Sequence, residues 1–231
     1  MGQNSYAGGR REEKSVQLIN VMASSLDGYI SRGAGDTDTR RRQEGFSGPA
    51  DQTHVEEQIR QADAIIVGAE SIRVAGGLWL VEGYKANPQQ RGPLWCVLTR
   101  KASADLLALR GFDLLPYWLV AKEAGPLPSQ HQPTRTKLYG DEGPARYLYR
   151  ELESHGCQRV LLFGGGHINT MFYAENLVDT LLLTLCPMLV GDEKAAKLVV
   201  PTLPSPTQMS LVASHSEASL VFLEYTVQKV E

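Results

Sequence analysis

The stretch of residues 159–169, RVLLFGGGHIN, limits the possible folds more than any other part of this chain. Its apolar run at 160–163 has the length of a strand and no alternation of polar and apolar residues. That pattern is typical of a parallel strand covered on both faces. Three glycines follow, and residues 170–175 then show a helical pattern. The order of strand, tight turn and helix predicts an α/β fold.

The glycine turn also predicts a place where an anion binds. Glycines let backbone N–H groups approach a bulky anion with no Cβ in the way. A helix that starts near His167 adds further free N–H groups and the positive end of its dipole. A nucleotide is therefore the leading ligand. The alternative is a glycine-rich turn that only lets strand and helix pack closely.

Length and charge narrow the class of protein. With 231 residues, of which 42% are hydrophobic, the chain can bury a large core, and we predict one domain over residues 16–231. Residues 1–15 are polar and lack the apolar core of a secretion signal, so we predict a flexible N-terminal tail. A net charge of -3 gives no basic field for nucleic acid. No apolar run approaches the roughly 18 residues of a membrane span. We expect a cytoplasmic protein.

Cysteine and histidine spacing gives no indication of a metal site. Cys96, Cys157 and Cys186 lie far apart, and the five histidines show no ligand spacing. We therefore expect neither a bound metal nor a disulfide framework. The chain also lacks the Gly-x-Gly-x-x-Gly fingerprint after an N-terminal strand, a phosphate loop with Gly-Lys-Ser/Thr, and a Gly-x-Ser-x-Gly elbow. An ordinary Rossmann dehydrogenase, a kinase and an α/β-hydrolase are thus disfavoured.

Further strands and helices follow from the apolar pattern. Strands are predicted at residues 16–22, 63–68, 94–99, 117–121 and 178–187, with a short edge strand at 137–140. Helices are predicted at 49–62, 69–73 and 144–155. Residues 211–230 alternate in part and predict a closing antiparallel hairpin. The sum is a mostly parallel sheet with antiparallel strands at the C-terminal end.

Two more segments fall where an open α/β sheet binds ligands. The strand ending at Gly68 delivers a second glycine to a helix start, with Ser71 in the first turn. Thr99 and Arg100 end another core strand, at the carboxyl edge of the sheet. Arg100 is a candidate for the 2′-phosphate that separates NADPH from NADH. Surface cations at a strand end are the alternative.

Three loops have two interpretations each. The Asp27-Gly28 step predicts either a hairpin turn or a substrate loop that carries one carboxylate. The run Arg40, Arg41, Arg42 is either a solvated surface or a contact for a phosphorylated substrate. Residues 76–92 predict a long loop beside the cleft. Its Trp79 and Tyr84 either cover the cleft or fix the loop to the core.

Four motifs in order resemble the reductase domain of bacterial riboflavin biosynthesis. They are MASSLDG at 22–28, ADAIIVG at 62–68, FGGGHIN at 163–169, and LVD at 177–179 with CPMLVG at 186–191. The similarity covers roughly residues 16 to 230, and the ordered set is far more specific than any single motif. The resemblance implies a dihydrofolate-reductase-like, three-layer α/β fold and a homodimer.

The resemblance also implies an activity and a set of site residues. The family uses NADPH to reduce 5-amino-6-(5-phosphoribosylamino)uracil, or its 2,5-diamino pyrimidinone relative, to a ribityl product. Ser25 and Asp27 would bind the substrate, with Asp27 also catalytic. Arg42, from the arginine run, is our own candidate for binding the substrate and does not follow from the resemblance. The cofactor would lie against residues of both glycine junctions and of the strand end: Gly68, Ser71, Thr99, Arg100, Gly164, Gly165, Gly166, His167, Ile168 and Asn169.

The chain departs from the family pattern at its phosphate contacts. Many members carry Asp-Asp-Pro-x-Leu-Thr-x-Arg where this chain has residues 73–79, RVAGGLW, and arginines where it has Gln52 and Thr53. Arg73 and the arginines at 40–42 are candidates to replace them. Two other functions stay open: a same-fold reductase of another heterocycle such as dihydrofolate, and a nucleotide-binding module without catalysis. A pterin reductase needs a buried carboxylate on the first helix. Three acidic residues are available there, Asp51, Glu56 and Glu57, and the pattern marks out none of them.

Overall fold

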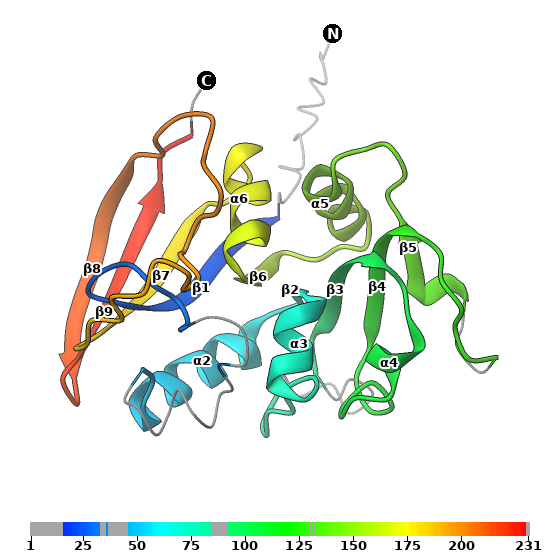
Figure 1. Cartoon of the computed structure of the whole chain (residues 1–231), viewed down its shortest axis with the longest axis horizontal. Coiled ribbons are helices and arrows are strands. Elements are labelled where there is room, and N and C mark those ends of the chain that lie inside the picture. The colour runs from blue at the N-terminus through cyan, green and yellow to red at the C-terminus, as the bar shows by residue number, and fades with distance from the viewer. Residues whose placement is uncertain are drawn as a thin grey trace, which may run out of the picture.

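One twisted nine-stranded sheet forms the centre of the molecule (Figure 1). The computed structural model describes residues 16–32, 36, 46–84, 92–129, 131 and 133–229. The predicted tail at 1–15 and the arginines at 40–42 lie outside this range. The strands follow the order β5-β4-β3-β2-β6-β1-β7-β9-β8. Neighbours from β5 to β7 are parallel, and the last two pairings are antiparallel.

The strand bounds agree with the predicted segments to within a few residues. The strands are β1 (Gln17–Ser25), β2 (Ala64–Gly68), β3 (Leu94–Lys101), β4 (Tyr117–Glu123), β5 (Thr136–Leu138), β6 (Arg159–Gly164), β7 (Thr180–Cys186), β8 (Met209–Glu217) and β9 (Leu220–Val227). All five residues of β2 are buried, as its unbroken apolar run predicts for a strand covered on both faces. The short strand β5 is at the edge of the sheet, which confirms its prediction.

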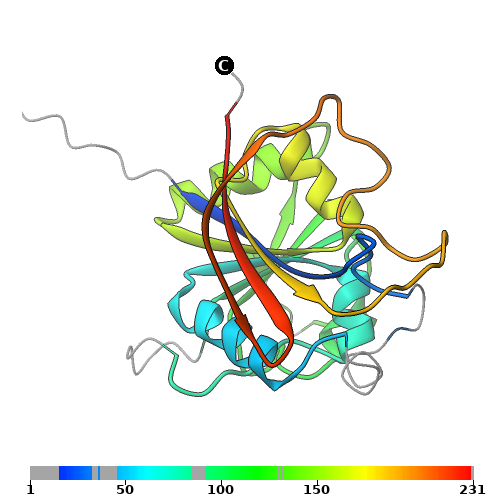
Figure 2. The same ribbon diagram turned by 90° about the vertical axis from the view of Figure 1, so that its left-hand side faces the viewer.

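Helices cover both faces of the sheet, so the molecule has three layers (Figure 2). The helices are α2 (Pro49–Gln61), α3 (Ala69–Ala75), α4 (Ala104–Leu107), α5 (Pro144–Ser154) and α6 (Gly166–Ala174), with a 3-10 turn η1 (Pro133–Arg135). One apolar core contains Ile59 of α2 and Ile72 of α3, and the other contains Leu148 of α5 and Phe172 of α6. The helices at 49–62, 69–73 and 144–155 were each predicted.

The C-terminal strands extend the sheet beyond β7. The β8–β9 hairpin pairs through β9 with the outer side of β7 (Figure 1), and Phe222 of β9 packs against His54 of α2 with ring centroids 5.2 Å apart. Most residues of β8 are exposed. The strand predicted at 178–187 corresponds to β7, which lies between β1 and β9 inside the sheet. The mostly parallel sheet with antiparallel C-terminal strands is therefore confirmed.

Candidate active site

The carboxyl ends of β2 and β6 bring the two predicted glycine junctions together. Val67 pairs with Gly164 across the sheet. A Cβ atom on Gly68 would lie 3.4 Å from Cγ1 of Ile168, so these two residues are in contact. The hydroxyl of Ser71 donates a 3.5 Å hydrogen bond to the carbonyl of Gly164. Residues nearly a hundred positions apart in the sequence thus form one edge of one site.

The glycine turn has a backbone that only glycine adopts without strain. Gly164 has φ +45° and Gly165 has φ +97°. A Cβ on Gly164 would lie 1.9 Å from Oδ1 of Asn169, and one on Gly166 would lie 2.4 Å from the carbonyl of Lys197. Gly165 caps α6 without a side-chain hydrogen bond. The first turn of α6 therefore offers its main-chain N–H groups to a bound acceptor.

A buried hydrogen-bond network holds this turn in place. Asn169 is fully buried, and its amide Nδ2 donates to the carbonyl of Leu198 at 2.8 Å. Its Oδ1 accepts from Nδ2 of Asn20 at 3.2 Å, and that Nδ2 also donates to the carbonyl of Leu162 at 2.8 Å. The hydroxyl of Tyr173 donates to Oδ1 of Asn20, and burial raises the pKa of this phenol. Side-chain amides thus tie α6 to β1 and β6.

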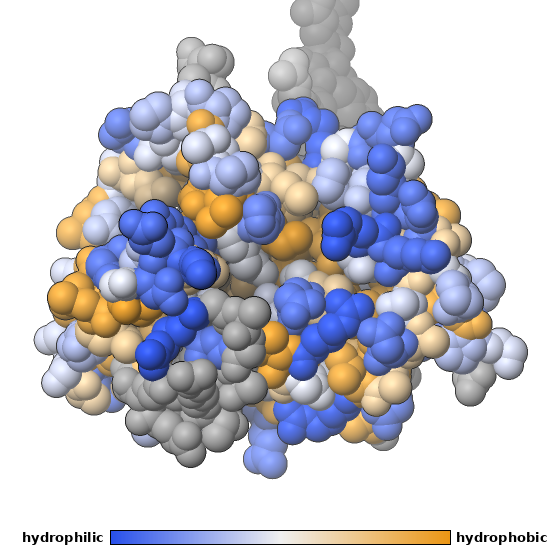
Figure 3. Space-filling model, in the orientation of Figure 1, coloured by the Kyte–Doolittle hydropathy of each residue, from blue (hydrophilic) through white to orange (hydrophobic). Residues whose placement is uncertain are grey.

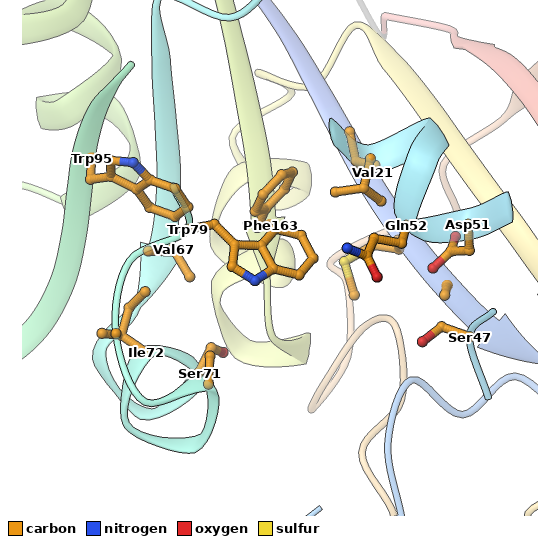
Figure 4. A pocket seen from close by; sticks show the side chains of 15 residues that line it. Val21, Ser47, Asp51, Gln52, Val67, Ser71, Ile72, Trp79, Trp95 and Phe163 are labelled. Atoms are coloured by element: carbon orange, nitrogen blue, oxygen red, sulfur yellow. The ribbon is translucent and has the colours of Figure 1, made fainter. Parts of the chain in front are cut away.

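A cavity of about 190 Å³ adjoins the turn on the face of the sheet that α2 and α3 cover. Figure 4 shows Trp79 and Phe163 in its middle, with Asp51 on one side and Ser71 on the other. Most of its wall is apolar. The lining residues are Val21, Met22, Ala23, Ser47, Asp51, Gln52, Val55, Val67, Ser71, Ile72, Ala75, Gly77, Trp79, Trp95 and Phe163. Because Ser71 both lines the cavity and contacts Gly164, the cavity and the glycine turn share a wall.

Asp51 is the only formally charged residue among those that line this cavity. It lies in the first turn of α2 and is 7% exposed. The helix N-terminus stabilises negative charge at this position. His54 follows one turn later, and burial lowers its pKa more than the nearby Asp51 raises it. The cavity therefore combines apolar walls with one buried carboxyl group.

The carboxylate of Asp27 is hydrogen-bonded within the protein. Ser25 donates its hydroxyl to Oδ1 at 2.5 Å. The backbone N–H of Gly191 donates to Oδ2 at 2.8 Å, and that of Val190 lies 3.1 Å from both oxygens. The Ser25 hydroxyl is the main cause that lowers the pKa of Asp27, and the two backbone donors lower it further. Gly28 has φ +84°, and β1 ends in a tight turn here without forming a hairpin with the next strand.

Of the other predicted cofactor residues, Thr99 and Arg100 lie one strand further along the same edge. Leu98 pairs with Gly68, so the two residues that follow it extend β3 at the carboxyl end. The Thr99 hydroxyl donates to the carbonyl of Lys101 at 3.0 Å. Arg100 is exposed. His167, another predicted contact, is exposed in the first turn of α6.

Arg73, a candidate for binding the substrate phosphate, forms ion pairs with two carboxylates of the protein. Its Nε lies 3.0 Å from a carboxylate oxygen of Asp105, and its Nη1 lies 3.6 Å from Glu70. The other candidate, Arg42, lies outside the described residues. Ser47, five positions after Arg42 in the sequence, lines the cavity.

The loop that follows α3 is fixed to the core and also lines the cavity. The hydroxyl of Tyr84 donates to the carbonyl of Ala62 at 2.7 Å, and burial raises its pKa to about 12. Trp79 packs against the core and forms part of the cavity wall. Tyr84 therefore fixes the loop to the core, whereas Trp79 both packs against the core and lines the cavity.

Sequence reasoning considered Asp51 only for a pterin reductase and did not single it out. A signal was nevertheless present, because Val55 and Ile59 mark the buried face of α2. Asp51 precedes Val55 by the same four residues and lies on that face.

Among the residues that the structure describes, no group of three or more His, Cys, Asp or Glu side chains is arranged to hold a metal ion. Within the same ranges, every helix is too short or too polar to cross a membrane.

Comparison with known proteins identifies relatives over almost the whole chain. The RibD C-terminal domain family matches residues 16–219. A 2,5-diamino-6-ribosylamino-4(3H)-pyrimidinone 5′-phosphate reductase of Methanothermobacter thermautotrophicus is 25% identical over 219 residues, which cover 91% of this chain and 98% of the relative. A pyrimidine reductase-like protein of Corynebacterium diphtheriae has a similar structure, with a TM-score of 0.69, 17% identity and 93% coverage of both chains. Dihydrofolate reductase of Enterococcus faecalis gives a TM-score of 0.50 at 12% identity, covering 92% of this chain and 97% of its own. The fold is therefore dihydrofolate-reductase-like.

Proposed function

The chain belongs to the RibD C-terminal domain family, and on that premise we propose that it is an NADPH-dependent reductase of riboflavin biosynthesis. Its substrate is 5-amino-6-(5-phosphoribosylamino)uracil or the 2,5-diamino pyrimidinone analogue, and its product carries a ribityl group. One observation supports the proposal most directly: Ser71 is hydrogen-bonded to the glycine turn at the start of α6 and also lines the apolar cavity. A reductase of this kind needs such an arrangement, because two ligands must meet in a dry site.

The glycine turn fits the pyrophosphate of NADPH. At Gly164 and Gly166 any Cβ would overlap a neighbouring atom, so glycine is needed there for the turn to pack; a Cβ on Gly165 would instead have Oγ of Ser71, which lines the cavity, as its nearest neighbour at 3.8 Å. The first N–H groups of α6 would donate to the oxygens of the pyrophosphate. The cofactor, when bound, supplies the hydride. Gly68 and Ser71 would line the nicotinamide side, and Thr99 with Arg100 would lie near the adenosine phosphate.

The rest of the site would act on the substrate. The ribosylamine opens to an imine, whose carbon accepts the hydride while its nitrogen accepts a proton. The apolar wall around Phe163 and Trp79 keeps water from the reacting carbon. Arg42 would hold the phosphate of the substrate.

Asp27 would act at the substrate loop, in company with Ser25. Its carboxylate accepts hydrogen bonds from the backbone N–H groups of residues 190–191, so its proposed role is to order the loop after β1; neither Ser25 nor Asp27 is among the residues that line the cavity. An Asp27→Asn variant should therefore lose turnover about tenfold to a hundredfold. A Glu193→Gln variant changes a nearby exposed carboxylate and should keep wild-type turnover. Full turnover by Asp27→Asn would remove Asp27 from the mechanism.

The test of the proposed function is NADPH oxidation by the purified protein. The phosphoribosylamino uracil and its 2,5-diamino analogue are assayed beside dihydrofolate, with NADH as the cofactor control. We expect turnover of at least one phosphoribosylamino compound and a preference for NADPH. Binding of NADPH without turnover of any of the three would contradict the proposal and favour a nucleotide-binding module.

Dihydrofolate is the second candidate substrate, and a specific observation favours it. The buried carboxyl group of Asp51 on α2 meets the requirement of a pterin reductase. The same assay separates the two activities, because turnover of dihydrofolate alone would assign the chain to pterin reduction.

We also infer that the protein is a homodimer. Leu211 and Val212 of β8 are 56% and 58% exposed, although both side chains are apolar. Figure 3 shows hydrophobic residues at the surface on the left side, where β8 and β9 lie in Figure 1. An exposed edge strand of this kind pairs readily with a second chain.

A further inference from the structure

The cavity beside the glycine turn, here called the first cavity, offers no cation to the phosphate of the proposed substrate. Among the described residues that line it, none is a lysine or an arginine. Arg73 follows directly after the lining residue Ile72, but its guanidinium is already paired with Asp105 and Glu70. A phosphate that carries two negative charges needs a cation or several N–H donors. Its contact must therefore lie beyond this cavity.

The first cavity has the size of a ring and not of a whole nucleotide. Its volume is about 190 Å³. An apolar cavity of about 150 Å³ holds a benzene molecule. A six-membered heterocycle with its small substituents therefore fits inside, and the ribose phosphate must extend out of the cavity.

A second cavity, of about 260 Å³, adjoins the first. Gln52 and Trp79 line both cavities, so the two share a wall. The other residues that line the second cavity are Glu56, Leu80, Val81 and Arg110. A substituent that leaves the first cavity past Gln52 and Trp79 therefore enters a space that contains a guanidinium.

Arg110 supplies the positive charge of the second cavity. It is exposed, and its guanidinium forms neither an ion pair nor a hydrogen bond with the part of the chain that the structure describes. Glu56, the carboxylate of the same cavity, is paired with Arg60 at 3.0 Å. A guanidinium presents parallel N–H donors that match two oxygens of a phosphate. The donors of Arg110 are thus available to a ligand.

The backbone of Arg110 is held against the loop that lines both cavities. The N–H of Leu78 donates to the carbonyl of Arg110 at 2.8 Å. A Cβ on Gly77 would lie 2.2 Å from the same carbonyl oxygen, so only glycine allows this close approach. Trp79 follows directly. Residues 73–79 are also where the chain departs from the family pattern, so the segment that lacks the family's phosphate contacts holds a different arginine beside the site.

We propose that Arg110 binds the phosphate of the substrate in the second cavity while the heterocycle occupies the first. This inference rests on the proposed function, and it adds to Arg42 a phosphate contact that the sequence pattern does not indicate. A guanidinium binds a charged phosphate more strongly than a neutral hydroxyl. Arg110 therefore selects the phosphorylated compound over the free riboside.

The first measurement is calorimetric binding of ribose 5-phosphate and of ribose to the NADPH-loaded protein. Wild type should bind ribose 5-phosphate at least about tenfold more tightly than ribose, as expected for a charge-assisted contact. Arg110→Gln should lower the affinity for ribose 5-phosphate at least about tenfold and leave that for ribose unchanged. The substitution changes an exposed side chain and keeps the backbone contacts with residues 77–78.

A matched control separates a local contact from a change in net charge. Arg146 is on α5, which packs in the core on the other face of the sheet, and its side chain is 64% exposed. Arg146→Gln removes the same charge and should keep the wild-type affinity for ribose 5-phosphate. The NADPH dissociation constant should be the same in all three proteins, which shows that each is folded.

Three results would overturn the inference. The first is binding of ribose 5-phosphate by wild type that is no tighter than binding of ribose. The second is an unchanged affinity for ribose 5-phosphate in Arg110→Gln, and the third is an equal loss in Arg146→Gln. The binding readout also separates this inference from the proposed function. If ribose 5-phosphate binds through Arg110 but neither phosphoribosylamino compound oxidises NADPH, the phosphate contact stands and the riboflavin assignment fails.

Discussion

Gly164 shows how closely the site depends on single atoms. Its φ of +45° and the 1.9 Å approach of Asn169 Oδ1 to any Cβ leave no room for a side chain. We expect Gly164→Ala to lower the free energy of unfolding by about 2 to 5 kcal/mol, because backbone strain adds to overpacking. NADPH binding should weaken as well. Urea denaturation and a fluorescence titration measure the two effects.

The matched control for this prediction is Gly156→Ala. Gly156 has φ +82°, but no atom lies within 4 Å of the position that a Cβ would take. This variant should therefore lose only the cost of strain, about 1 kcal/mol, and bind NADPH normally. Equal losses in the two variants would show that contact with Asn169 adds nothing.

Asp27 makes a pH-dependent contribution to the order of the substrate loop. Its pKa is lowered, first by the Ser25 hydroxyl and then by the backbone N–H groups of the 190–191 segment. A lowered carboxyl pKa in the folded state stabilises that state above the ordinary carboxyl pKa, and the gain is lost as pH falls through the folded-state pKa. Asp27→Asn should therefore be less stable than wild type near neutrality.

The difference in stability should disappear in acid. We expect the melting temperatures of wild type and Asp27→Asn to approach each other below the ordinary carboxyl pKa of about 4 and to meet once the pH is below the lowered folded-state pKa. The effect should be small, because the group is exposed to solvent. A gap that stays constant with pH would mean that the substitution acts through packing and not through the charge.

At the scale of elements, the amide network decides how α6 sits on the sheet. Asn169→Leu would leave the carbonyl of Leu198 and the amide of Asn20 without their present partner. Each such loss costs about 1 to 3 kcal/mol, so we expect a loss of about 2 to 5 kcal/mol in unfolding free energy. Tyr173→Phe removes a single donor to Asn20 and should cost about 1 kcal/mol. Chemical denaturation measures the loss of unfolding free energy in both variants. A smaller loss in Asn169→Leu than in Tyr173→Phe would mean that apolar packing, and not hydrogen bonding, holds α6 on the sheet.

The elements that approach the site were predictable, but the cavity was not. An unbroken apolar run followed by glycine marks β2 and β6 as buried strands that lead into helices, and both predictions are confirmed. The cavity needs α2 and α3 side by side over four strands, and that depends on the strand order. Asp51 was a candidate on the buried face of α2, yet local sequence cannot show that this face borders a cavity. The network of Asn20 was not predicted, because a lone polar residue inside a strand carries no sign of its partner.

At the scale of the whole molecule, the sheet order explains why distant motifs meet. β6 is inserted between β1 and β2, so the last glycine motif in the sequence lies next to the first strands. Parallel neighbours place their carboxyl ends at one edge, where an open α/β sheet binds ligands. The strand order depends on long crossover connections. The separation of two strands in the sequence does not specify whether they are neighbours in the sheet.

The hairpin of β8 and β9 leads to a prediction about assembly. Leu211 and Val212 are adjacent on the edge strand β8, where the register shifts between Leu211 and Ala213, and both apolar side chains are exposed. We expect the wild-type protein to have the mass of a dimer in light scattering after size-exclusion chromatography. Leu211→Lys combined with Val212→Lys should give a monomer, because charges on an edge strand oppose pairing with a second chain.

Leu189→Lys is the control for that double variant, because it also replaces an exposed apolar side chain. Leu189 is 71% exposed but lies in the loop after β7 and not on the edge strand β8. It should leave the dimer intact, and then the monomer of the double variant must come from the position of its charges. A monomeric wild type would contradict the dimer, because the apolar residues of β8 would then stay in water. A double variant with the mass of a dimer would show that the interface lies on another surface of the molecule.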